Sequence, residues 1–162
     1  MAVANGQGAR PQAAHAAEFA LTCIGAGLDR TVAEMFLACD ARLRNGRGVA
    51  LAVAVVDVES GSLTIATVGT VCAVLLQDDK EHLFVSAGGI VGAGYDRLLP
   101  ETMALAPGDV LVLFSNSVGK FLALQEQLKR SALSSRDQAR VVLNRWANAN
   151  EDAAVLIYRH EA

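Results

Sequence analysis

The chain has 162 residues, of which 52% are hydrophobic, and a formal net charge of −3 with 14 basic residues. This length suits a single domain over residues 1–162 and is short for two. The basic residues are scattered and no aromatic residues interleave with them, which argues against a nucleic-acid partner. A protein or a small ligand is the expected partner.

The cysteines and the N-terminus indicate the compartment. Cys23, Cys39 and Cys72 are odd in number, widely spaced and set among apolar residues, as buried thiols in a reducing compartment are. No apolar run reaches the roughly 18 residues that cross a bilayer, and the first residues lack the pattern of a signal peptide. We therefore expect a cytoplasmic protein that does not associate with membranes.

The first part of the chain has the periodicity of two helices. Residues 11–25 form the first, and the second follows to about residue 45, with Asp29 as its expected N-cap. The buried stripe predicted for the first helix consists of Ala14, Ala17, Leu21 and Ile24. That of the second helix consists of Val32, Phe36, Cys39 and Leu43.

From residue 48 the pattern changes to that of strands. An antiparallel meander is predicted over residues 49–58, 63–68 and 71–77, followed by a short extended piece at 83–85. The glycine-rich segment 88–94 lacks a following Lys-Ser/Thr, so we expect a flexible surface loop there and no phosphate cradle. Pro107-Gly108 predicts the tight turn of a hairpin that joins 98–105 to 109–115.

The C-terminal part returns to helices. Two are predicted, at 118–129 and at 134–147, the second with Trp146 on its apolar stripe, and a last strand covers 153–158. Helices, then hairpins, then helices and a final strand indicate an α+β domain with antiparallel sheets flanked by helices.

Several motifs occur in an order that resembles the PPM-type serine/threonine phosphatases, in particular the bacterial SpoIIE/RsbX-like branch, over nearly the whole chain. The motifs are Asn5-Gly6-Gln7-Gly8, Arg44 to Ala50, Thr67 to Val71, Pro107 to Asn116 and Glu151 to Ile157. The resemblance implies the PPM-like layered fold and a site with two Mg²⁺ or Mn²⁺ ions. In that family a water between the metals attacks phosphoserine or phosphothreonine, and aspartates offset the metal charge.

This sequence departs from the family pattern at the metal ligands. Asn5, followed by Gly6, stands where the family has the aspartate of Asp-Gly-x-Gly, and Asn116 stands in Ser-Asp-Gly, with Ser117 in place of the glycine. Glu151 and Asp152 stand for the final acidic pair, and the N-terminal hairpin with a further aspartate is absent. We identify five positions as a degenerate metal site, with no catalytic residue assigned: Asn5, Gly6, Asn116, Glu151 and Asp152.

Each residue also has an ordinary structural interpretation. Asn5-Gly6 is a common turn dipeptide, Asn116 could cap a helix that starts at Ser117, and Glu151-Asp152 could be a solvated turn. It is the joint placement in the family order that favours the lost metal site. Ser117 in place of glycine and the absent hairpin also depart from the family pattern. These further departures favour evolutionary drift over deliberate substitution of the two asparagines.

The resemblance implies a function in bacterial partner switching and stress signalling. We expect a pseudophosphatase that binds a phospho-regulated protein of the STAS-type anti-sigma antagonist class and needs no cofactor. A second hypothesis is a weakly active Mn²⁺- or Mg²⁺-dependent phosphatase that uses the remaining ligands. A third is a structural homodimer, because a missing hairpin would leave a sheet edge open to a second copy.

Overall fold

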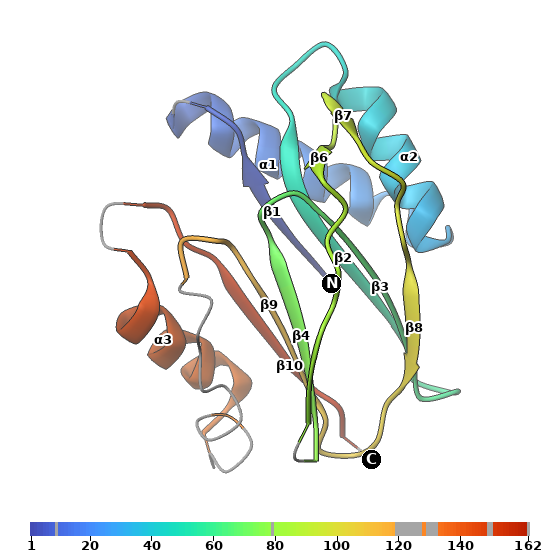
Figure 1. The fold of residues 1–162 in the computed structure, drawn as a ribbon, viewed down its shortest axis with the longest axis vertical. Coiled ribbons are helices and arrows are strands. Elements are labelled where there is room, and N and C mark those ends of the chain that lie inside the picture. The colour runs from blue at the N-terminus through green and yellow to red at the C-terminus, as the bar shows by residue number, and fades with distance from the viewer. Residues whose placement is uncertain (9, 79, 119–127, 129–132, 149–150, 162) are drawn as a thin grey trace.

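The protein is described by a computed structural model that covers residues 1–161 apart from 9, 79, 119–127, 129–132 and 149–150. It has four layers, in which two antiparallel sheets lie face to face and helices cover their outer faces. Figure 1 shows α1 and α2 beside β1, β2 and β3, and α3 beside β9 and β10. The α+β class and the layered, antiparallel architecture predicted from the sequence are confirmed.

The first sheet has the strand order β1-β2-β3-β8, and all its pairs are antiparallel. Its strands are β1 (Ala2–Gly6), β2 (Val49–Asp57), β3 (Ser62–Val68) and β8 (Glu101–Ala104). Two helices cover its outer face, α1 (Arg10–Gly25) and α2 (Val32–Leu43). Strand β1 lies at an edge of this sheet, so it pairs with a described strand on one side only.

The second sheet has the order β10-β9-β4-β5 and is also antiparallel throughout. Its strands are β4 (Cys72–Gln77), β5 (Lys80–Leu83), β9 (Val110–Phe114) and β10 (Val155–Arg159). Helix α3 (Ser135–Trp146) packs on its outer face, where Val142 is fully buried and Trp146 is half-buried. The helix predicted at 118–129 lies mostly outside the described residues.

Side chains alternate along β2, so one face of the strand contacts the helices and the other contacts the second sheet. On β2, residues 49, 51 and 53 face α1 and α2 and are Val, Leu and Val, while residues 50, 52 and 54 face the second sheet and are all alanine. Successive side chains of a strand point to opposite faces. The small alanines therefore set the close packing of the two sheets, and the larger residues fill the space beneath the helices.

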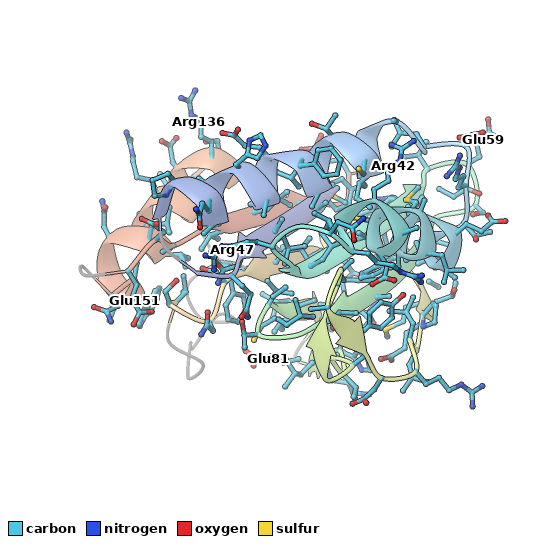
Figure 2. All side chains as sticks on the ribbon, turned by 90° about the horizontal axis from the view of Figure 1, so that it is seen from above. Arg42, Arg47, Glu59, Glu81, Arg136 and Glu151 are labelled. Carbon is cyan, nitrogen blue, oxygen red and sulfur yellow. The ribbon has the colours of Figure 1, made fainter. Side chains whose placement is uncertain are left out.

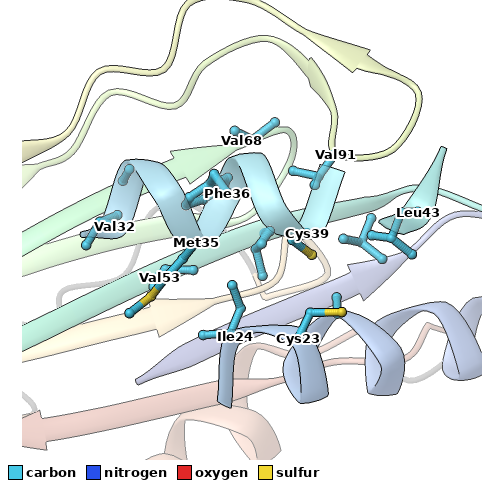
Figure 3. Packing of buried hydrophobic residues seen from close by; sticks show 14 of the residues in the cluster. Cys23, Ile24, Val32, Met35, Phe36, Cys39, Leu43, Val53, Val68 and Val91 are labelled. Atoms are coloured by element: carbon cyan, nitrogen blue, oxygen red, sulfur yellow. The ribbon is translucent and has the colours of Figure 1, made fainter. Parts of the chain in front are cut away.

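Helix α2 carries the predicted stripe. Figure 3 shows Val32, Phe36, Cys39 and Leu43 directed into the core against the sheet, and all four are buried. The N-cap is Thr31 and not Asp29 as predicted. The Thr31 hydroxyl accepts a hydrogen bond from the Glu34 amide, and the Glu34 carboxylate accepts one from the Thr31 amide at 2.9 Å. This reciprocal capping box outcompetes an aspartate two residues earlier.

The stripe predicted for α1 is wrong except at one position. The buried residues are Ala16, Ala20, Cys23 and Ile24, while Ala14 and Leu21 are exposed. Alanine fits either face of a helix, so an alanine-rich helix gives the pattern little to distinguish the faces. The free thiols of Cys23 and Cys39 are buried and that of Cys72 is half-buried, as expected of apolar core cysteines.

Two predicted strand connections are also wrong. The segments β8 and β9, predicted as a hairpin, belong to different sheets, because β8 pairs with β3 and β9 pairs with β4 and β10. The meander likewise ends at β3, since β4 lies in the second sheet. In both cases the local turn is present, and the chain uses it to cross between sheets.

The glycine-rich segment is held in place rather than flexible. It forms a small hairpin of β6 (Gly89–Ile90) and β7 (Gly94–Tyr95), and Val91 is fully buried and bridges to Val49. The Gly92 amide donates to Asp40 Oδ1 at 2.8 Å. Gly92 has φ +94°, and a Cβ there would collide with Leu43, so the glycine allows this loop to rest on α2.

Candidate functional site

The first side of the site is the end of β1. Asn5 pairs in register with Ala50 of β2, and Gly6 is the last residue of the strand. A Cβ at Gly6 would collide with the backbone carbonyl of Ala13, so only glycine lets α1 pass this close to the strand end. The chain therefore turns from β1 into α1 tightly, and the Asn5 side chain stands at the turn.

The second side is the end of β9, in the other sheet. Ser115 and Ser117 are buried, and their hydroxyl oxygens lie 2.9 Å apart. The Ser117 hydroxyl donates to the backbone carbonyl of Asp152 at 2.7 Å, and the Ala154 amide donates to the Ser115 hydroxyl at 3.0 Å. Two serine hydroxyls thus fasten the segment that carries Asp152 to the end of β9.

The two sides meet through the asparagines. Asn5 Nδ2 donates to Asn116 Oδ1 at 3.3 Å, a contact between residues 111 positions apart in the chain. A cavity of about 490 Å³ lies at this junction. Its lining includes all five positions predicted from the sequence, namely Asn5, Gly6, Asn116, Glu151 and Asp152.

The two acidic residues sit at the exposed rim of the cavity. Asn148 Nδ2 donates to Glu151 Oε1 at 3.0 Å, and the Glu151 amide donates to the Asn148 carbonyl, so these two residues are held together ahead of β10. Among the described lining residues Glu151 and Asp152 supply the carboxylates, and none is a lysine, an arginine or a histidine. The polar side chains of the described lining are therefore acidic, amide and hydroxyl groups, and alanines and glycines make up the rest.

The side chains present do not fit a two-metal centre. Two divalent cations need several carboxylate ligands to offset their charge, and here two of those positions carry neutral amides. The Asn116 carbonyl oxygen already accepts a hydrogen bond from Asn5, whose NH₂ group cannot ligate a cation. Within the described residues, no group of three or more histidine, cysteine, aspartate or glutamate side chains could hold a metal ion.

The structure brings the five predicted positions together around one cavity, but the residues that hold them in place were not predicted. The roles of Ser115 and Ser117 could have been suspected from a Ser-x-Ser pattern directly after an apolar strand, where hydroxyls often bond nearby backbone. The position of Arg47 had no such signal. A Cβ on Gly8, which lines the cavity and has φ +105°, would collide with the Arg47 guanidinium, so this cation lies against the rim.

Two antiparallel sheets between helical layers, with a cavity where β1 and β9 end, define the class as a PPM phosphatase-like domain. The serine/threonine phosphatase PstP/Ppp of Mycobacterium tuberculosis shares this fold, with a TM-score of 0.79 at 13% identity, over 99% of this chain and 88% of that one. The family profile of Stage II sporulation protein E (SpoIIE) matches residues 9–161, and the chain belongs to this family.

Two further solved structures are similar. A chain described under "The bacterial stressosome: a modular system that has been adapted to control secondary messenger signaling" has a TM-score of 0.92 at 25% identity, over 98% of this chain and 83% of that one. RsbX, solved in complex with magnesium, has a TM-score of 0.84 at 16% identity, over 96% and 77%. None of the curated proteins compared with the sequence matches it.

A membrane span was not expected, and the described part of the chain contains no helix of sufficient length and apolarity to cross a bilayer.

Proposed function

We propose that this protein is a pseudophosphatase, which uses a PPM-type fold to bind a phospho-regulated protein without hydrolysing its phosphate. The observation that carries the proposal is the hydrogen bond between Asn5 and Asn116. Where the family pattern has two carboxylates directed at cations, these two amides are joined to each other by a hydrogen bond. Each replacement also removes one negative charge from a site that would have to hold four positive ones.

The cavity is better suited to an unphosphorylated serine or threonine than to its phosphate ester. A phosphate carries close to two negative charges at neutral pH. The described lining offers two carboxylates and no cation, and Arg47 lies against Gly8 at the rim. The amides and hydroxyls of the lining can bond a neutral hydroxyl group. We therefore infer that the protein retains the dephosphorylated form of its partner.

The partner class that we propose is a STAS-type anti-sigma antagonist in bacterial partner switching and stress signalling, in the cytoplasm. Support comes from the neighbours in structure. One is described under the words "The bacterial stressosome", and another as the RsbU and RsbW domains of Rv1364c from Mycobacterium tuberculosis. A pull-down that enriches no STAS-domain protein would count against this partner.

The experiment that tests the proposal is hydrolysis of p-nitrophenyl phosphate and of a phosphoserine protein at millimolar Mn²⁺. The wild type is compared with Asn5→Asp/Asn116→Asp, which restores two carboxylates, and with Glu151→Ala/Asp152→Ala. We expect the wild type to be silent with both substrates. Hydrolysis by the wild type that disappears in Glu151→Ala/Asp152→Ala would show that the protein is an enzyme.

A weakly active Mn²⁺- or Mg²⁺-dependent phosphatase is the second candidate. The observation that favours it is that Glu151 and Asp152 line the same cavity as the two asparagines, which would make them the remnant of one metal site. The amide oxygens of Asn5 and Asn116 would then have to turn toward the ion, which breaks their mutual hydrogen bond. The hydrolysis assay described above separates this candidate from a binding protein.

A structural homodimer is the third candidate, favoured by the position of β1 at the edge of the first sheet. Edge strands present unpaired backbone groups that can pair with a second copy. Size-exclusion chromatography with light scattering distinguishes a dimer from a monomer directly.

A further inference from the structure

A second surface lies on the far side of Arg47 from the cavity. A groove of about 570 Å³ runs between α1 and the segment that leads from α2 into β2. One wall is the α1 face with Pro11, His15 and Phe19, which recur every four residues and so lie along one side of the helix. Figure 2 looks down on α1 and shows Arg47 beside it. We call this surface the α1 groove.

The α1 groove is apolar at its floor and basic at its rim. Ala16 and Leu43 lie buried at the bottom, and Phe19 keeps 40% of its surface exposed beside them. Arg42 and Arg47 stand on the opposite wall, and neither is paired with a carboxylate within the described part of the chain. An exposed aromatic ring next to an open apolar floor is unusual for a surface that faces only water.

The α1 groove is basic, although the chain as a whole has a negative net charge. The protein has a net charge of −3, but the described lining residues include two arginines and no aspartate or glutamate. Arg42 is also held in place, since its Nη1 donates to the Cys23 thiol at 3.8 Å. A partner that fits this surface therefore needs both apolar and acidic groups.

The shape of the groove favours a helix over a small molecule. Most of its lining residues are exposed, including Pro11, His15 and both arginines, whereas pockets for small ligands bury most of the ligand surface. Pro11 and Phe19 lie eight helical steps apart, which is about 12 Å or two turns. A helix laid along α1 could place an apolar side chain on each turn and acidic residues on the side that faces Arg42 and Arg47.

We propose that the α1 groove docks an amphipathic, acidic helix of a protein partner. An apolar side chain of that helix packs against Phe19 and Leu43, and its carboxylates pair with Arg42 and Arg47. The Arg47 guanidinium also lies against Gly8 at the rim of the cavity, so a helix in the groove sits beside the pseudophosphatase site. The inference rests on the proposed function in one respect, that the ligand is a protein.

The test is selection of helix-forming peptides from a phage-displayed library against the full-length wild-type chain. During the selection, the groove variant Phe19→Ser/Arg47→Glu is added in solution as a competitor. It captures the peptides that bind outside the α1 groove. We expect the selected peptides to share large apolar residues three or four positions apart, with aspartate or glutamate alongside. Fluorescence polarisation then gives their Kd, which should rise about tenfold or more with Phe19→Ser and with Arg42→Glu/Arg47→Glu.

The controls separate the groove from the cavity and from misfolding. Leu28→Ser, at an exposed position outside the groove, and Asn5→Asp/Asn116→Asp, in the cavity, should leave the peptide Kd within about twofold. On the wild type, amide NMR shifts on peptide addition should concentrate on residues 11–19 and 42–47. The proposal is overturned if no peptide is enriched, if enriched peptides are basic, or if their binding ignores the groove substitutions. None of these results would alter the outcome of the hydrolysis assay.

Discussion

Replacing Ser117 by alanine removes one hydroxyl and two hydrogen bonds from the centre of the site. The Ser117 hydroxyl donates to the Asp152 carbonyl at 2.7 Å and lies 2.9 Å from the Ser115 hydroxyl, and both serines are buried. Loss of a buried partner costs about 1–3 kcal/mol, so we expect the free energy of unfolding to fall by about 2 kcal/mol. For a chain of this length that lowers Tm by about 4–8 °C.

The chain offers a matched control for this substitution. Ser60 and Ser62 also have hydroxyl oxygens 3.0 Å apart at the same spacing in sequence, but their pair is exposed to water. Ser62→Ala should therefore change the free energy of unfolding by at most about 0.5 kcal/mol. Differential scanning calorimetry on both variants provides the comparison.

The same variant has a local consequence. If the serine hydroxyls hold the acidic segment against β9, hydrogen exchange at Ala154 should be faster in Ser117→Ala than in the wild type, because that amide donates to Ser115. Equal Tm values for Ser117→Ala and Ser62→Ala, with unchanged exchange at Ala154, would refute the view that the hydroxyls organise the site.

Three further predictions concern α2. Phe36→Ala should cost about 3–5 kcal/mol in a denaturant titration because Phe36 is fully buried, whereas Leu37→Ala, at a position 64% exposed, should cost about 0.5 or less. Hydrogen bonds from the Thr31 amide and hydroxyl hold the pKa of Glu34 below its ordinary value, so its stabilisation is present above its unfolded pKa and lost as pH falls through the folded pKa. The Tm advantage of the wild type over Glu34→Gln should therefore shrink as the pH falls from the ordinary pKa of 4.5 through the lower pKa of the folded state. Burial raises the pKa of the Cys39 thiol to about 12, so iodoacetamide at about pH 8 should label it on the order of a thousandfold more slowly in the native than in the unfolded protein.

Each of these predictions has an outcome that contradicts it. Similar costs for Phe36→Ala and Leu37→Ala would show that the core beneath α2 is not packed as described. A constant Tm difference between the wild type and Glu34→Gln across the acid range would show that the ionised Glu34 carboxylate does not stabilise the cap. Rapid native labelling of Cys39 would show that the thiol is accessible.

The sequence predicted α2 well and α1 poorly, for a physical reason. In α2 the buried positions carry large residues such as Phe36 and Leu43 on an otherwise polar helix, so the period is clear. In α1 alanine occurs on all sides, and the buried face is fixed by the tight turn at Gly6 and by contacts with the sheet. Such contacts depend on the tertiary structure and leave no local pattern.

Strand partners show a similar limit. The turn at Pro107-Gly108 was predicted correctly, but β8 pairs with β3 and β9 with β4, choices that depend on residues about 40 positions away. At the site, all five positions were predicted because the family order places them together. The hydrogen bond between Asn5 and Asn116 was not, since it needs both strand ends in one place.

The most direct test of the lost metal site is calorimetric titration of the metal-free protein with Mn²⁺. Asn5→Asp/Asn116→Asp serves as the comparison, because it restores two carboxylates at the junction of the two sheets. The account predicts that the wild type takes up no pair of tightly bound Mn²⁺ ions and that the variant binds Mn²⁺ more strongly than the wild type. Two tight Mn²⁺ sites in the wild type would contradict it.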